Sequence, residues 1–268
     1  MTMVSGKGER HASAKASKRK SLGPSKRDKH KRRLKQKVSI AEKEALNKVS
    51  VAKSKQKKEA VQVKSPSPSQ QLEFFLDKFQ SVNGVKLSTL ELESITENCI
   101  VKAPVGHDQD ASNLGEHLKF AFGSSWENKL CGTELDQGKI EAGSPAVIIF
   151  STSALRSLDL LRELHPLTRK CQAAKLFSKH MKIENQVSLL KNRVNIASGT
   201  PSRIKKLIEM EALQLSRLEV LVFDMQMDVK GFSLFTLPQV SNEFWDLYKT
   251  YFHQRLQQGK VLICLYGS

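Results

Sequence analysis

The sequence has few aromatic residues and few cysteines, and neither group is arranged to hold a metal. Aromatic side chains make up 6% of the 268 residues, and none occurs in the first 64 positions. Cys99, Cys131, Cys171 and Cys264 lie far apart and form no Cys-x-x-Cys pair. This spacing argues against a zinc site and against a disulfide framework. We predict no metal and no cofactor.

The sequence also lacks long apolar runs. No stretch approaches the length that crosses a bilayer, and the polar, basic N-terminus has no apolar core of a signal peptide. Paired carboxylates and a nucleophile elbow are absent as well. We therefore expect an intracellular protein of a reducing compartment that makes no membrane contact.

Acidic residues are scarce in the first quarter of the chain. Residues 1–64 hold 21 lysines and arginines against 5 acidic residues, whereas the rest holds 23 against 22. This asymmetry predicts a disordered basic tail and Ser-Pro linker over residues 1–69 and a globular domain over 70–268. The densest basic clusters contain Lys18, Arg19, Lys20, Lys29, Lys31, Arg32 and Arg33. Such clusters are typical of nuclear-import signals and of nucleic-acid-binding arms, and both interpretations stay open. A run of charges that only keeps the protein soluble is less favoured, because such a run would not need charges of one sign only.

The second half of the chain alternates apolar runs with amphipathic helical patterns. The run Ala146–Phe150 is continuously apolar, as expected of a strand buried on both faces. Further strands are predicted near 173–177, 194–197, 220–223 and 261–265, with helices near 154–164, 184–193, 200–208 and 242–257. This alternation predicts an α/β fold with a parallel sheet flanked by helices.

A polar segment follows the third predicted strand. Thr200 suits the N-cap of the next helix, with its hydroxyl accepting from a backbone N–H, and Pro201 suits the first helical position. With Arg203 in the first turn, this helix start is able to hold a phosphate. An ordinary helix start explains the same residues and is favoured by spacing alone.

The fourth predicted strand ends on Asp224, in the form of a Walker B strand. Such an aspartate helps to hold Mg²⁺, and a following glutamate orients the attacking water. Met225 stands in the place of that glutamate and accepts no proton. An aspartate also commonly ends a buried strand without any metal.

Three segments together resemble the first RecA-like domain of DEAD-box RNA helicases. Residues 150–158 (FSTSALRSL) are similar to the family's P-T-R-E-L-A segment, and residues 199–204 (GTPSRI) resemble its T-P-G-R segment. Residues 221–226 (LVFDMQ) fall where L-D-E-A-D belongs. The first two segments touch the RNA backbone in that family, so the resemblance implies RNA contacts by Ser151, Thr152, Ser153, Arg156, Gly199, Thr200 and Arg203. For Arg156, an exposed helix residue is an equally good interpretation.

The chain departs from that family in its catalytic parts. No G-x-x-x-x-G-K-[ST] loop occurs, and the water-orienting glutamate is missing. From the length we also expect no second RecA-like domain. These departures predict a protein that is not an enzyme, and they argue against an active helicase. We further expect the first helices of the domain to cover the vacant nucleotide pocket.

The segments SALRSLDLLREL, KLFSKHMKIENQVSLLKNRV, GTPSRIKKLI and LEVLVFD resemble the Cms-type family, helicase-like proteins of the early small-subunit pre-ribosome, or small-subunit processome. The resemblance implies a nuclear, nucleolar protein with pre-ribosomal RNA and proteins as partners, acting in ribosome biogenesis and rRNA processing. We expect a monomer outside that assembly. Two functions stay open: an RNA-binding assembly factor, and a protein-docking module whose globular domain does not touch RNA.

Overall fold

Five parallel strands form one sheet in the order β2-β3-β1-β4-β5. They are β1 Val147–Phe150, β2 Ala174–Leu176, β3 Ile196–Gly199, β4 Val220–Asp224 and β5 Leu262–Tyr266. On the outer side of β5, Ile100 forms an isolated parallel bridge with Ile263. The structure is a computed structural model that describes residues 66–104 and 109–267. The predicted tail residues Lys18, Arg19, Lys20, Lys29, Lys31, Arg32 and Arg33 lie outside the described residues.

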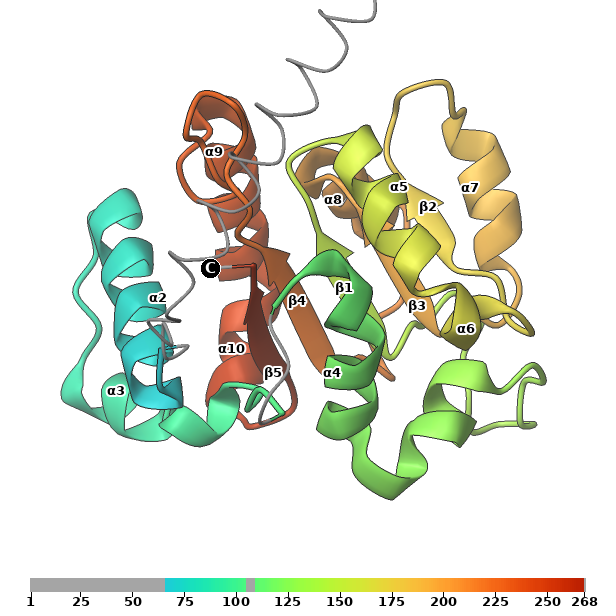
Figure 1. Ribbon diagram of the computed structural model, residues 1–268, viewed down its shortest axis with the longest axis horizontal. Helices are drawn as coiled ribbons and strands as arrows, with labels where there is room; N and C mark the ends of the chain where they lie inside the picture. The colour runs from blue at the N-terminus through green and yellow to red at the C-terminus, as the bar shows by residue number, and fades with distance from the viewer. Residues whose placement is uncertain (1–65, 105–108, 268) are drawn as a thin grey trace, which may run out of the picture. The chain divides into compact units, whose positions relative to one another are not determined.

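Helices cover both faces of the sheet, which gives three layers (Figure 1). One face packs against α2 Pro68–Asn83, α7 Ile183–Leu190, α8 Pro201–Glu209, α9 Pro238–Leu247 and α10 His253–Gln257. The other face packs against α4 Leu114–Phe122, α5 Ala154–Glu163 and α6 His165–Thr168. Along β1, Ile148 and Phe150 enter the first core, and Val147 and Ile149 enter the second. Burial on both faces explains the continuous apolar run, and the α/β parallel-sheet prediction is confirmed.

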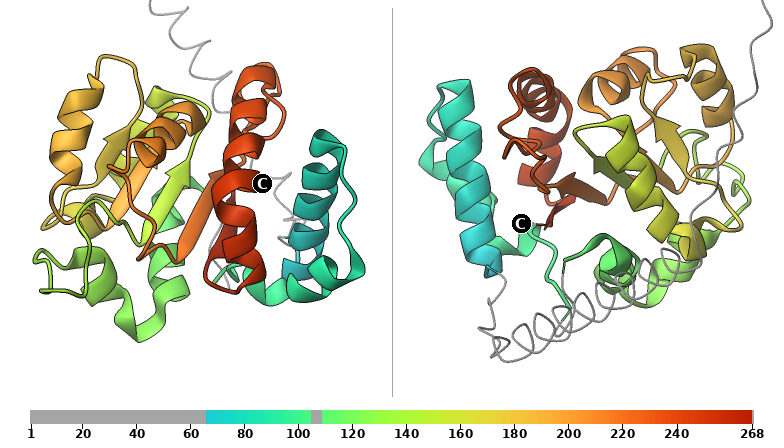
Figure 2. Two further views of the ribbon diagram at one scale, coloured as in Figure 1. Left: turned by 180° about the vertical axis from the view of Figure 1, so that it is seen from behind. Right: turned by 45° about the horizontal axis from the view of Figure 1, so that its top comes forward.

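Helix α2 starts the described part of the domain. It begins at Pro68, two residues before the predicted onset of order, because Ser67 forms a capping box with Gln70. Its Phe75 packs against the rings of Phe223 on β4 and Trp245 on α9. Figure 2 shows α2 beside the helices that precede β5. The helix therefore covers an apolar face of the sheet next to β4.

The last helix is longer than predicted. It begins at Pro238 rather than near residue 242, and a π-helical turn, Tyr248–Phe252, joins α9 to α10. The aromatic side chains Phe244, Trp245, Tyr248 and Phe252 of this segment are buried.

Helices α5 and α3 Thr89–Ser94 leave apolar side chains exposed. Leu155 of α5 is 64% exposed, whereas Leu160 and Leu164 are fully buried. In α3, no residue is buried. Among the described residues, no helix combines the length and apolarity needed to cross a membrane.

Candidate nucleic-acid interface at the carboxyl edge of the sheet

The structure brings the predicted edge residues together. Ser151 follows β1, Thr200 follows β3 and Asp224 ends β4, and these three strands are neighbours in the sheet. Arg156 stands in the first turn of α5, directly above the same edge. All these strands are parallel, so their carboxyl ends meet at one side.

Asp224 forms a bidentate ion pair with Arg156. Nε of Arg156 donates to Oδ2 of Asp224 at 2.8 Å, and Nη2 donates to Oδ1 at 2.9 Å. The aspartate side chain is 1% exposed and the arginine side chain 20%. Burial raises the pKa of Asp224, and the hydrogen bond and charge of Arg156 oppose that rise. The guanidinium of Arg156 therefore points inward to a buried carboxylate.

This ion pair determines whether Asp224 is able to help bind Mg²⁺, as the aspartate of a Walker B strand does. Both oxygens of Asp224 already accept hydrogen bonds from a cation, and the adjacent Met225 is buried and apolar. Among residues 66–104 and 109–267, no group of three His, Cys, Asp or Glu side chains is placed to hold a metal ion. The donor set does not fit Mg²⁺.

The serines after β1 have two different roles. Ser151 is fully buried, and its hydroxyl donates to the carbonyl of Ser153 at 3.2 Å. The exposed Ser153 caps α5, because its Oγ accepts from the backbone N–H of Arg156 at 3.2 Å. Thr152 between them is half-buried. Ser153 and Thr152 thus present polar groups at the surface, whereas Ser151 fastens the turn to the sheet.

Gly199 and Thr200 fasten the neighbouring turn. A Cβ at Gly199 would lie 1.9 Å from the carbonyl oxygen of Leu176, so β2 and β3 approach too closely for any side chain there. Thr200 occupies the N-cap of α8 as predicted, but its hydroxyl forms no capping bond, and this part of the prediction is wrong. Its backbone N–H instead donates to Leu176 at 3.1 Å.

Arg203 is also engaged within the protein. Its Nη1 donates to Oε1 of Gln186 at 2.7 Å. The amide of Gln186 then donates to the carbonyls of Lys175 at 2.7 Å and Phe177 at 3.0 Å, on the outer edge of β2. Arg203 therefore orients the glutamine that satisfies this edge strand.

Sequence patterns did not single out Gln186, nor the buried pair Ser157 and Ser198. The last two hydroxyls lie 2.7 Å apart and join α5 to β3. Each of these residues is a polar residue on the inward face of its helix or strand, and the sequence shows that much. Helical and strand periodicity do not show which residue it bonds to.

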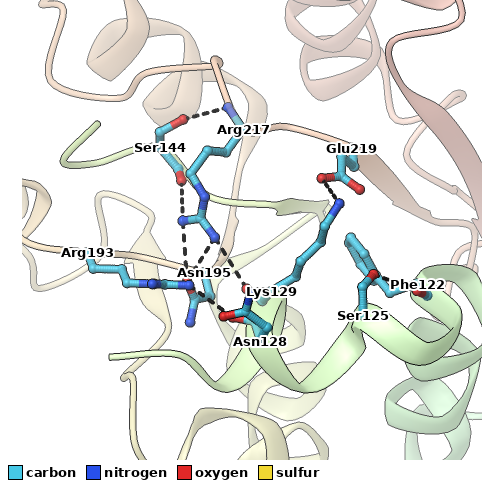
Figure 3. Close-up of polar contacts among 9 residues, drawn as sticks. All are labelled: Phe122, Ser125, Asn128, Lys129, Ser144, Arg193, Asn195, Arg217 and Glu219. Atoms are coloured by element: carbon cyan, nitrogen blue, oxygen red, sulfur yellow. Dashed lines mark hydrogen bonds and ion pairs between the residues drawn. The ribbon is translucent and has the colours of Figure 1, made fainter. Parts of the chain in front are cut away.

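Two further arginines lie at the opposite, amino edge of the sheet. Arg193 and Arg217 converge on Oδ1 of Asn195, at 2.9 Å and 3.3 Å (Figure 3). Arg193 also donates to the carbonyl of Asn128, and Arg217 to that of Ser144. Burial, and then the charge of Arg193, lowers the pKa of Arg217. This network holds the loop before β1 and is structural.

The fold is α/β with a parallel sheet. At the carboxyl edge of the sheet, the aspartate in the Walker B-like position forms an ion pair within the protein. A sequence model described as "CMS1: U3-containing 90S pre-ribosomal complex subunit" matches residues 1–266. The chain belongs to this family and is thereby an assembly factor of the 90S pre-ribosome.

Individual relatives agree with this assignment. Protein CMSS1 of Xenopus laevis is 30% identical over 206 residues, which span 75% of this chain and 68% of the relative. Protein CMS1 of Chaetomium thermophilum is 42% identical over 146 residues, 53% of this chain and 55% of the relative. Among solved structures, the S. cerevisiae Dbp5 complex with Nup159 and Gle1 aligns at a TM-score of 0.36 and 11% identity. That alignment covers 76% of this chain and 46% of the solved one.

Proposed function

We propose that this chain is a non-enzymatic factor of the early small-subunit pre-ribosome that binds RNA in the nucleolus and supports rRNA processing. The observation that carries the non-enzymatic part is the pair between Arg156 and Asp224. A carboxylate whose two oxygens are held by a guanidinium is not available to a nucleotide-bound metal. Family membership supports the pre-ribosomal part.

The basic tail supplies the main RNA contact in this proposal. Its 21 basic residues against 5 acidic ones would bind phosphates with little sequence preference and with strong salt dependence. The carboxyl edge would add contacts from the exposed Ser153 and the half-buried Thr152. Arg156 and Arg203 would shape this edge from within, because each is already bound to another residue.

A second candidate function is docking of a protein at the same edge. Met227 and Val229, in the loop after Asp224, are 68% and 103% exposed. The loop has a defined shape, since Oδ1 of Asp228 accepts from the backbone N–H groups of Lys230 at 2.8 Å and Phe232 at 2.9 Å. Two exposed apolar side chains on an ordered turn favour a protein partner.

The experiment combines nucleotide titration with particle sedimentation. Calorimetric titration of the pure full chain with Mg-ATP should give no saturable heat, and gradient fractions from cells should hold the chain together with U3 RNA. Saturable binding accompanied by hydrolysis would overturn the non-enzymatic proposal. Absence of the chain from U3-containing fractions would overturn the pre-ribosomal one.

The docking candidate has its own variant. Met227→Ser with Val229→Ser should lower the fraction of the chain in U3-containing particles and leave RNA affinity unchanged. A double variant with wild-type particle association would remove this loop from docking. Phe120→Ser, at an exposed apolar residue on α4, is the matched control.

A further inference from the structure

Positive charge is concentrated at one edge of the sheet within the described domain. Residues 65–268 are nearly neutral, with 23 basic and 22 acidic residues. Residues 162–175, around β2, hold four of the basic residues and one acidic residue, whereas residues 66–100 hold two basic and five acidic residues. Because β2 and β5 form opposite edges of the sheet, and α2 lies beyond β5, these segments lie at opposite sides of the domain (Figure 1).

A hollow lies within the basic segment. It measures about 590 Å³ and is bounded by α5, α6 and β2. Its rim carries Arg162, His165, Arg169 and Lys175, and no acidic residue lines it. The apolar side chains of Leu158 and Leu161 contribute to its walls. A second hollow, of about 710 Å³, adjoins it through the shared Gln172 and adds Lys170.

The cations around this hollow are available to bind a ligand, whereas the arginines at the carboxyl edge are bound within the protein. Within residues 66–104 and 109–267, the side chains of Arg169, Lys170 and Lys175 form no ion pair and no hydrogen bond, and all three are exposed. Arg162 pairs with Asp159 on the same helix, at a solvent-exposed position where such a pair is easily exchanged. Arg156 and Arg203, by contrast, are held by Asp224 and Gln186.

We propose that this hollow, with Arg162, Arg169 and Lys175 on its rim, binds the phosphate backbone of single-stranded RNA. Several cations around one concave surface whose lining holds no acidic residue fit a chain of phosphates. The acidic segment at the opposite edge orients the domain with its β2 edge towards RNA. The site deepens the proposed function and rests on it, because it requires that the chain meets RNA in the pre-ribosome.

The test uses the full chain and a charge-matched control. The site variant carries Arg162→Gln, Arg169→Gln and Lys175→Gln. The control carries Lys86→Gln, Lys249→Gln and Lys260→Gln, three exposed lysines outside the hollow. The net charge is the same in both, so any general loss of attraction affects them equally. Far-ultraviolet circular dichroism and Tm verify that both variants fold.

Affinity for a single-stranded RNA oligonucleotide is measured over a salt series. Relative to the control, the site variant should bind on the order of tenfold more weakly at low salt, and the slope of log K against log salt should fall by about 2, because three phosphate contacts are lost. Ultraviolet crosslinks of the unmutated chain should include residues 158–175. Equal affinities and slopes for the two variants would overturn the proposal.

Particle sedimentation distinguishes a failure of the RNA-binding proposal for the hollow from a failure of the proposed function. Suppose that the site variant is lost from U3-containing fractions but binds RNA as tightly as the control. The hollow would then bind an acidic protein surface. This result would overturn the RNA proposal and would be consistent with the pre-ribosomal role. If the unmutated chain is itself absent from those fractions, the proposed function fails, whatever the salt series shows.

Discussion

Arg156 and Asp224 lie 68 residues apart in the chain and form a two-bond ion pair at the carboxyl edge of the sheet. The aspartate is almost fully buried, so its charge depends on this partner. Removing one member of a buried pair leaves the other charge uncompensated, whereas removing both avoids that cost.

Arg156→Ala should therefore lower the free energy of unfolding by about 3–5 kcal/mol at neutral pH. Burial already raises the pKa of Asp224 above its unfolded value, and loss of the arginine charge would raise it further. A carboxyl with a raised folded-state pKa binds its proton more readily when folded, so its unfavourable contribution shrinks as the pH falls through that pKa. Urea unfolding at neutral and acidic pH should show a smaller penalty under acidic conditions.

The double variant Arg156→Met with Asp224→Asn supplies the contrast. It should recover most of the lost stability, since no buried charge remains. A double variant as unstable as Arg156→Ala would show that packing around the arginine, rather than charge compensation, sets the cost.

The two members of this pair also show how far sequence reasoning reaches. Apolar runs such as Ala146–Phe150 predicted the strands, because a strand buried on both faces needs nothing but apolar residues. The ends of those runs then placed Ser151, Thr200 and Asp224 at one edge. The apolar runs did not predict where the guanidinium of Arg156 points, because its direction depends on a contact between distant parts of the chain.

The buried face of a helix is hard to predict for a related reason. In α5, the leucines at 155, 158 and 161 and those at 160 and 164 form two competing stripes, and both have helical spacing. The fold buries Leu160, Leu161 and Leu164, leaves Leu158 half-buried and exposes Leu155. The choice depends on which face meets the sheet, and the adjacent Ser157 fixes it through Ser198.

Gly199→Ala should prevent β2 and β3 from pairing as they do. The new Cβ would lie 1.9 Å from the oxygen of Leu176, and that atom is backbone that cannot swing away. We expect a loss of several kcal/mol, or failure to fold, measured by thermal unfolding. Gly115→Ala in α4 is the matched control: its nearest neighbours would lie at 3.8 Å and 3.9 Å, and it should gain about 0.5–1 kcal/mol from helix propensity. Equal stability of the two variants would contradict this account.

Gln186→Ala should loosen the β2 edge by removing two hydrogen bonds to carbonyls. It also leaves Arg203 without its side-chain acceptor, so we expect a loss of about 1–3 kcal/mol. Hydrogen exchange of the backbone N–H groups in Ala174–Leu176 should accelerate in this variant and also in Arg203→Ala. Unchanged exchange in Arg203→Ala would mean that the arginine does not orient Gln186. Asn185→Ala, at the exposed neighbouring position on α7, is the control.

His253 should make stability depend on pH near the ordinary imidazole range. Its ring stacks on Phe79 at 4.7 Å between centroids, and its Nδ1 lies 3.1 Å from the hydroxyl of Tyr248. Burial lowers the pKa of His253, and the charge of Glu91 opposes this only in part. The unfolded chain therefore binds the proton more tightly than the folded one, and stability should fall as the pH drops below about 6.5.

His253→Phe removes this titration and keeps a ring against Phe79. The difference in unfolding free energy between variant and wild type should thus change between pH 7.5 and pH 5.5, in favour of the variant at the lower value. A constant difference for His253→Phe would mean that the imidazole is protonated equally in the folded and unfolded chains, and that its packing against α2 does not oppose the charge.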